Sequence, residues 1–251
     1  MSQYLAGRTV VVAGSTSAAG VAVVRTLSQA GARVAAVDIL ADRVQELSGA
    51  HENVTGYVCN LADLQAVEDL AATVRQDLGS VDGLIHLVGG WRGGEGIKGQ
   101  ADHDWDFLHT SVLTTLRNTS RAFYDDLAAS PAGRLAIVSA QSASSPTADG
   151  AAYAAVKSAA EAWTLAVANG FRQLQGGNET PSAQQSAALV FVVKALVDDR
   201  MRAAQPERKF PGFTDVSVLA DAVERIFHLE AGQINGQRLS LTAGHLAGAL
   251  S

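Results

Sequence analysis

Short apolar runs alternate along this chain with longer segments in which apolar residues recur every three or four positions. The first pattern is typical of buried strands and the second of amphipathic helices. The expected strands span residues 9–13, 33–38, 54–59, 82–88, 133–139, 186–193 and 237–242. The expected helices span residues 18–30, 41–48, 63–78, 104–129, 150–174 and 215–229. Because strands that alternate with helices form βαβ units, the pattern predicts an α/β fold, with a doubly wound parallel sheet of about seven strands and helices on both faces.

Three segments that directly follow expected strands have the composition of loops: residues 89–99, which contain six glycines, 142–150 and 194–214. In an open parallel sheet, ligands bind at the carboxyl ends of the strands, so these loops are expected to border a site. Residues 175–185 are polar and are expected to link a helix to a strand. No internal repeat or domain-splitting linker interrupts the pattern, so residues 1–251 are expected to form a single domain.

The first expected strand runs into a turn of small residues that opens a helix. Backbone N–H groups and the positive end of a helix dipole meet at such a turn and can accept a pyrophosphate, which predicts a Rossmann-type dinucleotide site. The turn residues expected to hold the cofactor are Gly14, Ser15, Thr16, Ala18, Ala19 and Gly20.

Asp38 ends the second expected strand, 24 residues beyond Gly14. A carboxylate at this place can accept hydrogen bonds from both ribose hydroxyls, whereas it repels a 2′-phosphate. The sequence therefore favours NAD(H) over NADP(H). The alternative role for Asp38 is the N-cap of the helix that begins near residue 41.

Tyr153 and Lys157 are four residues apart on an expected helix, so their side chains share one face. A cation beside a phenol favours the phenolate, which would let Tyr153 exchange protons near neutral pH. The alternative is an ordinary amphipathic helix with the tyrosine at the edge of the core and the lysine in solvent.

Composition excludes several classes of partner. The net charge is −6, the isoelectric point is near 5.5, and no run of Lys and Arg is present, so neither nucleic acid nor an anionic membrane is expected as a partner. Without a long apolar segment or a recognisable leader, a cytoplasmic location is expected. Cys59 is the only cysteine and is expected to be a small buried hydrophobe. His103 and His109 are six residues apart on a helix, and no metal site is expected.

These residues carry a resemblance to the short-chain dehydrogenase/reductase family that spans essentially the whole chain. Its T-G-x-x-x-G-x-G turn corresponds to residues 13–20, with Ala18 in place of the middle glycine, and its Y-x-x-x-K pair is intact. The resemblance implies an NAD(P)-dependent oxidoreductase in which Tyr153 is the general acid or base and Lys157 assists it. It also implies that the cofactor contacts the residues after the third and fourth strands, namely Asn60, Leu61, Val88, Gly89 and Gly90.

Two members of the family's catalytic tetrad are replaced. The serine position, thirteen residues before the tyrosine, is Ala140, and the helix asparagine falls at Val112. Neither side chain can donate or accept a hydrogen bond. Ser139 is expected to point to the other face of the strand, because successive side chains alternate. Ser142 is therefore the better substitute donor.

The pattern is most similar to the quinonoid dihydropteridine reductase branch, which also has alanine at the serine position and a Gly-Gly-Trp-x-Gly-Gly loop. Here that loop spans residues 89–94. The resemblance implies hydride transfer to a small conjugated acceptor, whose charge spreads over several heteroatoms so that one donor fewer is tolerated. Trp91, Ala140 and Ser142 are the expected substrate contacts. The alternative for Trp91 is a hydrophobic lid plug or an oligomer contact.

Two alternative functions remain open, and a third does not account for the residues. A ketone or alcohol oxidoreductase that uses Ser142 is the nearest alternative, and a dinucleotide-binding sensor or scaffold with little catalysis is another. A methyltransferase would share the glycine turn but would leave Tyr153 and Lys157 unexplained. The family resemblance also implies a homo-oligomer, dimer or tetramer, that packs through the helices expected at 104–129 and 150–174.

Overall fold

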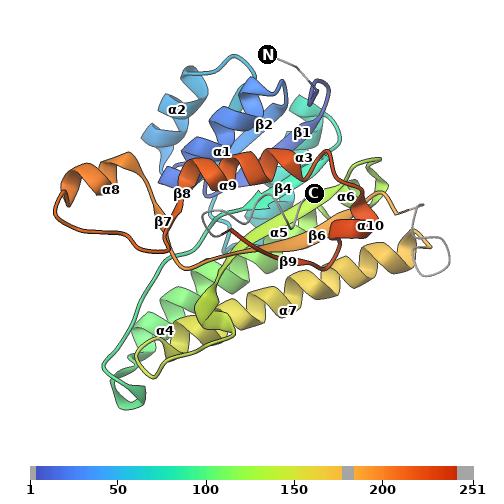
Figure 1. Ribbon diagram of the computed structural model, residues 1–251. Helices are drawn as coiled ribbons and strands as arrows, with labels where there is room; N and C mark the ends of the chain where they lie inside the picture. The colour runs from blue at the N-terminus through green and yellow to red at the C-terminus, as the bar shows by residue number, and fades with distance from the viewer. Residues whose placement is uncertain (1–3, 177–183, 242–251) are drawn as a thin grey trace.

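The computed structural model describes residues 4–176 and 184–241 and contains a seven-stranded parallel sheet (Figure 1). The strands follow the spatial order β3-β2-β1-β4-β5-β6-β9. They are β1 (Thr9–Ala13), β2 (Arg33–Asp38), β3 (Val54–Val58), β4 (Gly83–His86), β5 (Arg134–Ala140), β6 (Ala187–Val193) and β9 (Arg238–Ser240). The order reverses between β1 and β4, which makes this pair the place where a doubly wound sheet binds ligands. The predicted fold class and sheet are confirmed.

Helices cover both faces of the sheet. The helices of the first face are α1 (Ala18–Gln29), α2 (Ala41–Gly49), α9 (Val216–Arg225) and α10 (Ala231–Ile234), which share one apolar core with the sheet. The helices of the second face are α3 (Leu64–Leu78), α4 (Asp102–Leu108), α5 (Thr115–Ala122), α6 (Tyr124–Ala129) and α7 (Ala151–Leu174). In Figure 1, α7 runs the length of the sheet on the side opposite to α1 and α9. Each face therefore buries a separate apolar cluster.

The helix predicted over 104–129 is not continuous. A π-helical turn, η2 (His109–Thr114), separates α4 from α5, and Phe123 separates α5 from α6. Within this stretch the Ser111 and Thr115 hydroxyls donate to carbonyls four residues earlier, those of Phe107 and Ser111. Such bonds compete with the backbone ladder and bend helices. The turn coincides with Val112, the position at which the family carries its helix asparagine.

The loop predicted over 194–214 contains secondary structure of its own. It holds β7 (Leu196–Val197), α8 (Asp199–Ala204) and β8 (Thr214–Asp215), where β7 and β8 form a small second sheet. Asp198 caps α8 by accepting from the Met201 N–H at 2.7 Å, and Arg202 ties α8 to Asp215 at 2.6 Å. Figure 1 shows this segment projecting from the body of the molecule beyond β6. Residues 177–183 of the predicted linker and residue 242 of the last predicted strand lie outside the described residues.

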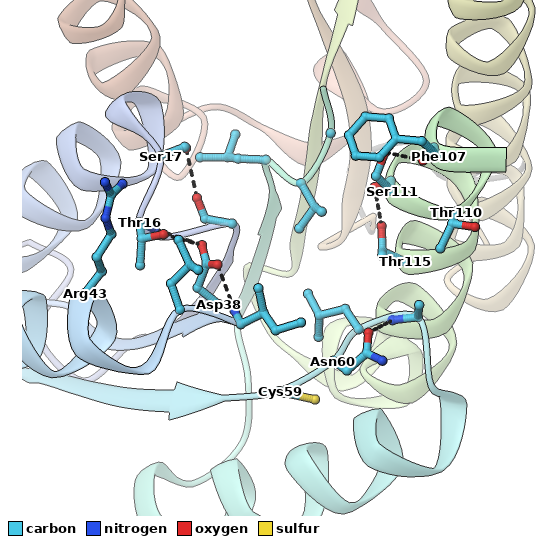
Figure 2. Close-up of a pocket in the computed structure, with 18 of the residues that line it drawn as sticks. Thr16, Ser17, Asp38, Arg43, Cys59, Asn60, Phe107, Thr110, Ser111 and Thr115 are labelled. Atoms are coloured by element: carbon cyan, nitrogen blue, oxygen red, sulfur yellow. Dashed lines mark hydrogen bonds between the residues drawn. The ribbon is translucent and has the colours of Figure 1, made fainter. Parts of the chain in front are cut away.

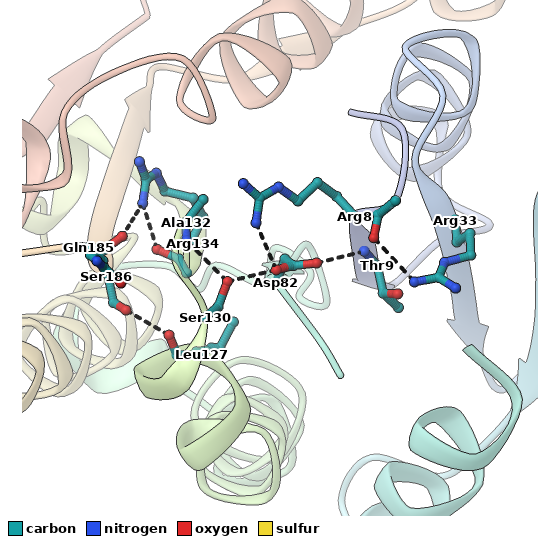
Figure 3. A network of polar contacts seen from close by, with 12 residues as sticks. Arg8, Thr9, Arg33, Asp82, Leu127, Ser130, Ala132, Arg134, Gln185 and Ser186 are labelled. Carbon is teal, nitrogen blue, oxygen red and sulfur yellow. Dashed lines mark hydrogen bonds and ion pairs between the residues drawn. The ribbon is translucent and has the colours of Figure 1, made fainter. Parts of the chain in front are cut away.

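A polar network holds the opposite, amino-terminal edge of the sheet (Figure 3). The Asp82 carboxylate accepts from the Thr9 N–H at 2.9 Å and from the Ser130 hydroxyl at 2.7 Å, and it pairs with Arg8 at 3.1 Å. The buried Arg134 guanidinium donates to the carbonyls of Ile226, Gly133, Gln185 and Leu229. Because buried polar groups must be hydrogen-bonded, this network fixes the ends of the strands while the carboxyl edge stays free for a ligand.

Candidate active site

A cavity of about 740 Å³ opens at the switch point, between the carboxyl ends of β1, β2 and β4 and the α4–η2 segment (Figure 2). Its lining is Gly14, Thr16, Ser17, Asp38, Ile39, Leu40, Arg43, Cys59, Asn60, Leu61, Ala62, Leu87, Val88, Gly89, Asp106, Phe107, Thr110, Ser111 and Thr115. This is where the sequence predicts the adenosine and pyrophosphate of a dinucleotide.

The glycine-rich turn is built from close backbone approaches. Gly14 has φ of +82°, and a Cβ at this position would lie 2.9 Å from the backbone of Leu87 and Val88. A Cβ at Gly20 would collide with the Gly14 carbonyl oxygen. Ser17 caps α1 by accepting from the Gly20 N–H at 3.0 Å. Glycine is thus required at both positions by the fold, and the turn is held in a shape that suits a phosphate.

Asp38 faces the cavity and is held in place by the turn. Its Oδ2 accepts from the Thr16 N–H at 3.0 Å and from the Thr16 hydroxyl at 2.8 Å, and its Oδ1 accepts from the Ile39 N–H at 2.7 Å. The alternative role as a helix cap is wrong, because Leu40 is the N-cap of α2 and no side chain caps that helix. Arg43, on the first turns of α2, lines the same end of the cavity, as the labelled side chains in Figure 2 show.

Seven of the predicted cofactor residues line the cavity: Gly14, Thr16, Asp38, Asn60, Leu61, Val88 and Gly89. The remaining predicted residues are outside the lining: Ser15, Ala18, Ala19, Gly20, Gly90, Tyr153 and Lys157. Ser15 is fully buried behind the turn, and its hydroxyl has no hydrogen-bond partner among the described residues. Asn60 uses its Oδ1 to accept from the Ala62 N–H at 3.1 Å, so it shapes the loop it lies in.

Sequence reasoning missed the wall formed by α4 and η2. Phe107, Thr110, Ser111 and Thr115 face the cavity, and Phe107 lies so close to Gly90 that a Cβ there would be 2.8 Å from its ring. The sequence signal for this wall is the group of hydroxyl residues at 110, 111 and 115. Arg43 had a clearer signal, since a basic residue five positions after Asp38 is close in sequence to the carboxylate expected at the ribose.

Tyr153 and Lys157 lie on one face of α7, as their spacing predicts. The Lys157 ammonium is buried and donates to the Val138 carbonyl at 2.9 Å, and its Nζ lies 5.7 Å from the centre of the Tyr153 ring. A Cβ at Gly89 would be 3.7 Å from the same Nζ. Because Gly89 lines the cavity, the pair stands at the inner end of the dinucleotide site.

Burial moves both pKa values away from their ordinary range. Desolvation lowers the pKa of Lys157 to about 8, and the nearby Glu161 carboxylate opposes that shift. Desolvation raises the pKa of Tyr153. The sequence led us to expect a phenol pKa lowered toward neutrality by Lys157, and the direction is the opposite because the phenol is desolvated by burial. Tyr153 therefore holds its proton at neutral pH and is suited to donate it.

His86 is the last residue of β4 and is buried. Its two ring nitrogens are each 3.1 Å from a threonine hydroxyl, those of Thr115 and Thr119. Burial, together with the positive charge of Lys157, lowers the pKa of His86 to about 3. The imidazole is therefore neutral, and it joins β4 to α5 without adding a charge to the site.

The serine position is filled by Ala140, the last residue of β5, which is buried. Ser139 points to the opposite face, as expected, and donates to Glu161 at 2.5 Å. Ser142 lies in a short 3₁₀ turn, η3 (Gln141–Ala143), and its buried hydroxyl has no partner among the described residues. A buried hydroxyl without a partner costs about 1–3 kcal/mol, so Ser142 retains an unused donor, although Ser142 does not line the cavity described above.

Trp91 lies outside this cavity. Its side chain is about two-thirds exposed (66%) and lines a second hollow of about 610 Å³ with Gly93, Gly94, Glu95, Gly99 and Asp149. Asp149 pins the glycine loop, since its carbonyl accepts from the Gly94 N–H at 2.9 Å and its carboxylate from the Gly96 N–H at 2.8 Å. The loop is thus tied to the segment that precedes α7.

Other chemistry finds little support in residues 4–176 and 184–241. No cluster of three or more potential metal ligands occurs there, and none of the helices described is long and apolar enough to cross a membrane. Cys59 is buried, as expected, although it also lines the main cavity, and burial raises its thiol pKa.

Comparison with known proteins identifies the fold and the relatives of this chain. A family model described as short chain dehydrogenase matches residues 8–175. A 2,3-dihydro-2,3-dihydroxybenzoate dehydrogenase of Bacillus subtilis is 26% identical over 162 residues, which are 63% of this chain and 62% of that protein. The 3-oxoacyl-(acyl-carrier-protein) reductase FabG of Vibrio harveyi is 25% identical over 244 residues, which are 96% of this chain and 98% of that protein.

Solved structures share the fold at low sequence identity. A short chain oxidoreductase from Pseudomonas aeruginosa PAO1, described as containing an atypical catalytic center, superposes with a TM-score of 0.82 at 17% identity, covering 96% of this chain and 97% of that one. NAD⁺-bound xylitol dehydrogenase superposes with a TM-score of 0.78 at 15% identity, covering 96% and 100%.

Proposed function

Because the chain belongs to the short-chain dehydrogenase family, whose model matches residues 8–175, we propose that it is a nicotinamide-dependent oxidoreductase in which Tyr153 transfers the proton. The observation that carries this proposal is the continuity of the site: the cavity begins at Asp38, follows the glycine turn, and reaches Lys157 at Gly89. These residues fit a dinucleotide, because the cavity has a carboxylate that could accept from ribose hydroxyls at one end and, behind Gly89 at the other, a cation close to a phenol.

Each residue has a separate task in this scheme. Asp38 binds the adenine ribose, the turn after Gly14 holds the pyrophosphate, and Lys157 holds the nicotinamide ribose. The nicotinamide supplies the hydride chemistry. Tyr153, with its proton retained by burial, donates it to the substrate atom that gains electrons. NAD(H) is proposed as the preferred cofactor because Asp38 lines the cavity at the end where the adenine ribose would bind, and its charge would repel a 2′-phosphate.

The proposed substrate is a small flat conjugated acceptor, such as a quinonoid dihydropterin. Ala140 supports this choice, because reduction of an isolated ketone concentrates charge on one oxygen, where one extra donor is worth about 2.7–4 kcal/mol. In a conjugated ring that charge is shared, so the loss of one donor matters less. The sequence suggested that Trp91 stacks on such a ring. Trp91 lines a separate hollow, so the substrate argument rests on Ala140.

A second candidate is reduction of simple ketones with Ser142 as the replacement donor. The supporting observation is the unpartnered buried hydroxyl of Ser142, which lies in η3, two residues after the end of β5. A third candidate, a dinucleotide-binding sensor, is motivated by the apolar side chains of Ala140 and Val112.

One experiment separates the three. NADH oxidation is measured against quinonoid dihydropterin, a quinone, a 3-oxoacyl thioester and simple ketones, with Tyr153→Phe as the matched variant. We expect the conjugated acceptors to be reduced fastest and Tyr153→Phe to lose most turnover while NADH binding stays intact. Preference for ketones would support the Ser142 candidate, and tight NADH binding without any turnover would support the sensor.

A homo-oligomer and a cytoplasmic location complete the proposal. The outer surface of α7 exposes Leu165, and α5 and α7 are the helices through which packing was expected. Light scattering of the purified chain measures the oligomeric state directly.

A further inference from the structure

A buried carboxylate lies one helical turn beyond the Tyr153–Lys157 pair. Glu161 is only 8% exposed. One of its oxygens accepts from the Ser139 hydroxyl at 2.5 Å, and the other accepts from the Arg238 Nε at 2.7 Å. This network lies on the face of β5 opposite to Ala140, so nothing in the usual tetrad accounts for it.

The network is anchored on four segments. Glu161 belongs to α7, Ser139 to β5 and Arg238 to β9, and the Arg238 Nη2 also donates to the Ser144 hydroxyl at 3.2 Å in the segment after η3. A buried carboxylate is unfavourable unless it is paired and hydrogen-bonded, and here both conditions are met. Because the Arg238 side chain is about a third exposed (37%), water weakens its hold on the carboxylate.

Lys157 has no ion-pair partner of its own within residues 4–176 and 184–241, and its ammonium donates only to the Val138 carbonyl. The groups around Lys157 come from the elements packed against α7. His86 on β4 is neutral, η2 contributes the Val112 side chain, and β6 faces α7 with apolar side chains. On α7 itself the neighbours are the neutral Tyr153 phenol and, four residues on, the Glu161 carboxylate.

We propose that Glu161 is a positioning residue of the Tyr153–Lys157 site: its buried negative charge keeps Lys157 protonated in a dry environment, and Arg238 holds the carboxylate there. Residues four apart on a helix have Cβ atoms roughly 5–6 Å apart, so the interaction needs no direct contact. Desolvation otherwise drives the ammonium toward its neutral form, and the carboxylate is the group that opposes this. The catalytic meaning of this role rests on the proposed function, whereas the coupling between the two charges does not.

The test reads the titration of Lys157 in the protein alone. The chain has four lysines, Lys98, Lys157, Lys194 and Lys209, so ¹³C,¹⁵N-lysine labelling gives few NMR signals, and Lys157→Arg assigns the one of interest. Glu161→Gln should move the Lys157 titration to lower pH, because an opposite charge favours the protonated lysine; a shift of about one unit is expected, since Arg238 offsets part of the effect. Ser139→Ala removes a hydrogen bond and keeps the charge, so its Lys157 should titrate as in the parent protein.

Two results would overturn the proposal: an unchanged Lys157 titration in Glu161→Gln, or an equal shift in Ser139→Ala, which would make the role structural. If Glu161→Gln does not fold, Glu161→Gln with Arg238→Met removes both charges together and leaves none unpaired. The Lys157 titration should also move to lower pH in this double variant, and an unchanged titration overturns the proposal. Failure of NADH binding or turnover would refute the proposed function alone, because the titration needs neither. Where turnover exists, the alkaline limb of kcat/KM should move with the Lys157 titration.

Discussion

Replacing Asp38 by asparagine tests whether this carboxylate selects the cofactor. Both Asp38 oxygens accept hydrogen bonds, one from Thr16 and the other from the Ile39 N–H, so asparagine removes the charge together with one of these acceptors. The lost acceptor affects both cofactors alike, whereas the lost charge affects only the one with a 2′-phosphate. A 2′-phosphate carries a charge of about −1.5 to −2, and two unit charges 4 Å apart interact by about 1 kcal/mol in water. Because Asp38 is only partly buried, the value for water applies, and the repulsion is about 1.5–2 kcal/mol.

Arg43 acts in the opposite direction. It lines the same end of the cavity and would attract a 2′-phosphate, but its side chain is exposed, so its contribution is less than about 1 kcal/mol. The net preference for NADH is then about 0.5–2 kcal/mol, which is about two- to thirtyfold in dissociation constant. Asp38→Asn leaves the Arg43 attraction unopposed, so it should bring the ratio of the two constants to one or slightly in favour of NADPH, and Arg43→Gln should raise it further in favour of NADH.

Fluorescence titration with NADH and with NADPH measures both constants for the parent protein and the two variants. The preference should shrink at high salt, because partly exposed charges are screened within about 10 Å at 0.1 M ionic strength. Equal constants in the parent protein, or a ratio that Asp38→Asn leaves unchanged, would refute the reasoning. Tighter NADPH in the parent protein would show that Arg43 outweighs Asp38.

Three further predictions concern pH, specificity and stability. Desolvation lowers the pKa of Lys157 to about 8, so its protonated form is lost as pH rises through that value. The rate of reduction should therefore fall above about pH 8 and stay level below neutrality until another group titrates. A profile of kcat/KM against pH checks this. Ala140→Ser should raise kcat/KM for a simple ketone more than for a conjugated acceptor, and an equal gain for both would contradict the donor argument. Gly20→Ala should lower stability by about 1–3 kcal/mol in a thermal melt, because its Cβ meets backbone that cannot yield, whereas the control Gly49→Ala has open space around it and should melt as the parent protein does.

Most of the architecture could be predicted from the sequence because strands buried on both faces are uninterrupted apolar runs. The segments 9–13 and 33–38 were predicted to the residue for this reason. The helix expected over 104–129 was predicted as continuous, but a π-helical turn interrupts it. Hydroxyl groups that donate to carbonyls four residues earlier accompany this turn, and apolar periodicity does not reveal such bonds. The segment 194–214 was called a loop for a similar reason, since α8 is short and depends on Asp198 and Arg202.

The candidate site divides in the same way. Asp38 and Gly14 were found from spacing, because backbone geometry after a strand leaves few places for a phosphate or a ribose. Phe107 was missed, because its position depends on how α4 crosses the sheet rather than on any local motif. The direction of the Tyr153 pKa was also mispredicted, since burial is a property of the packed structure.

That last difference bears on the roles of the two side chains. Desolvation raises the pKa of Tyr153, so the phenol keeps its proton at neutral pH and can serve as the proton donor of the proposed reduction. Lys157 must remain charged to hold a ribose hydroxyl in such a dry place, and its own burial works against that. The groups around Lys157 decide whether it stays protonated. His86 is neutral and Val112 is apolar, so the Glu161 carboxylate is the group on α7 that opposes the loss of charge. Glu161 is therefore the residue whose replacement tests most directly whether Lys157 keeps its charge in these apolar surroundings.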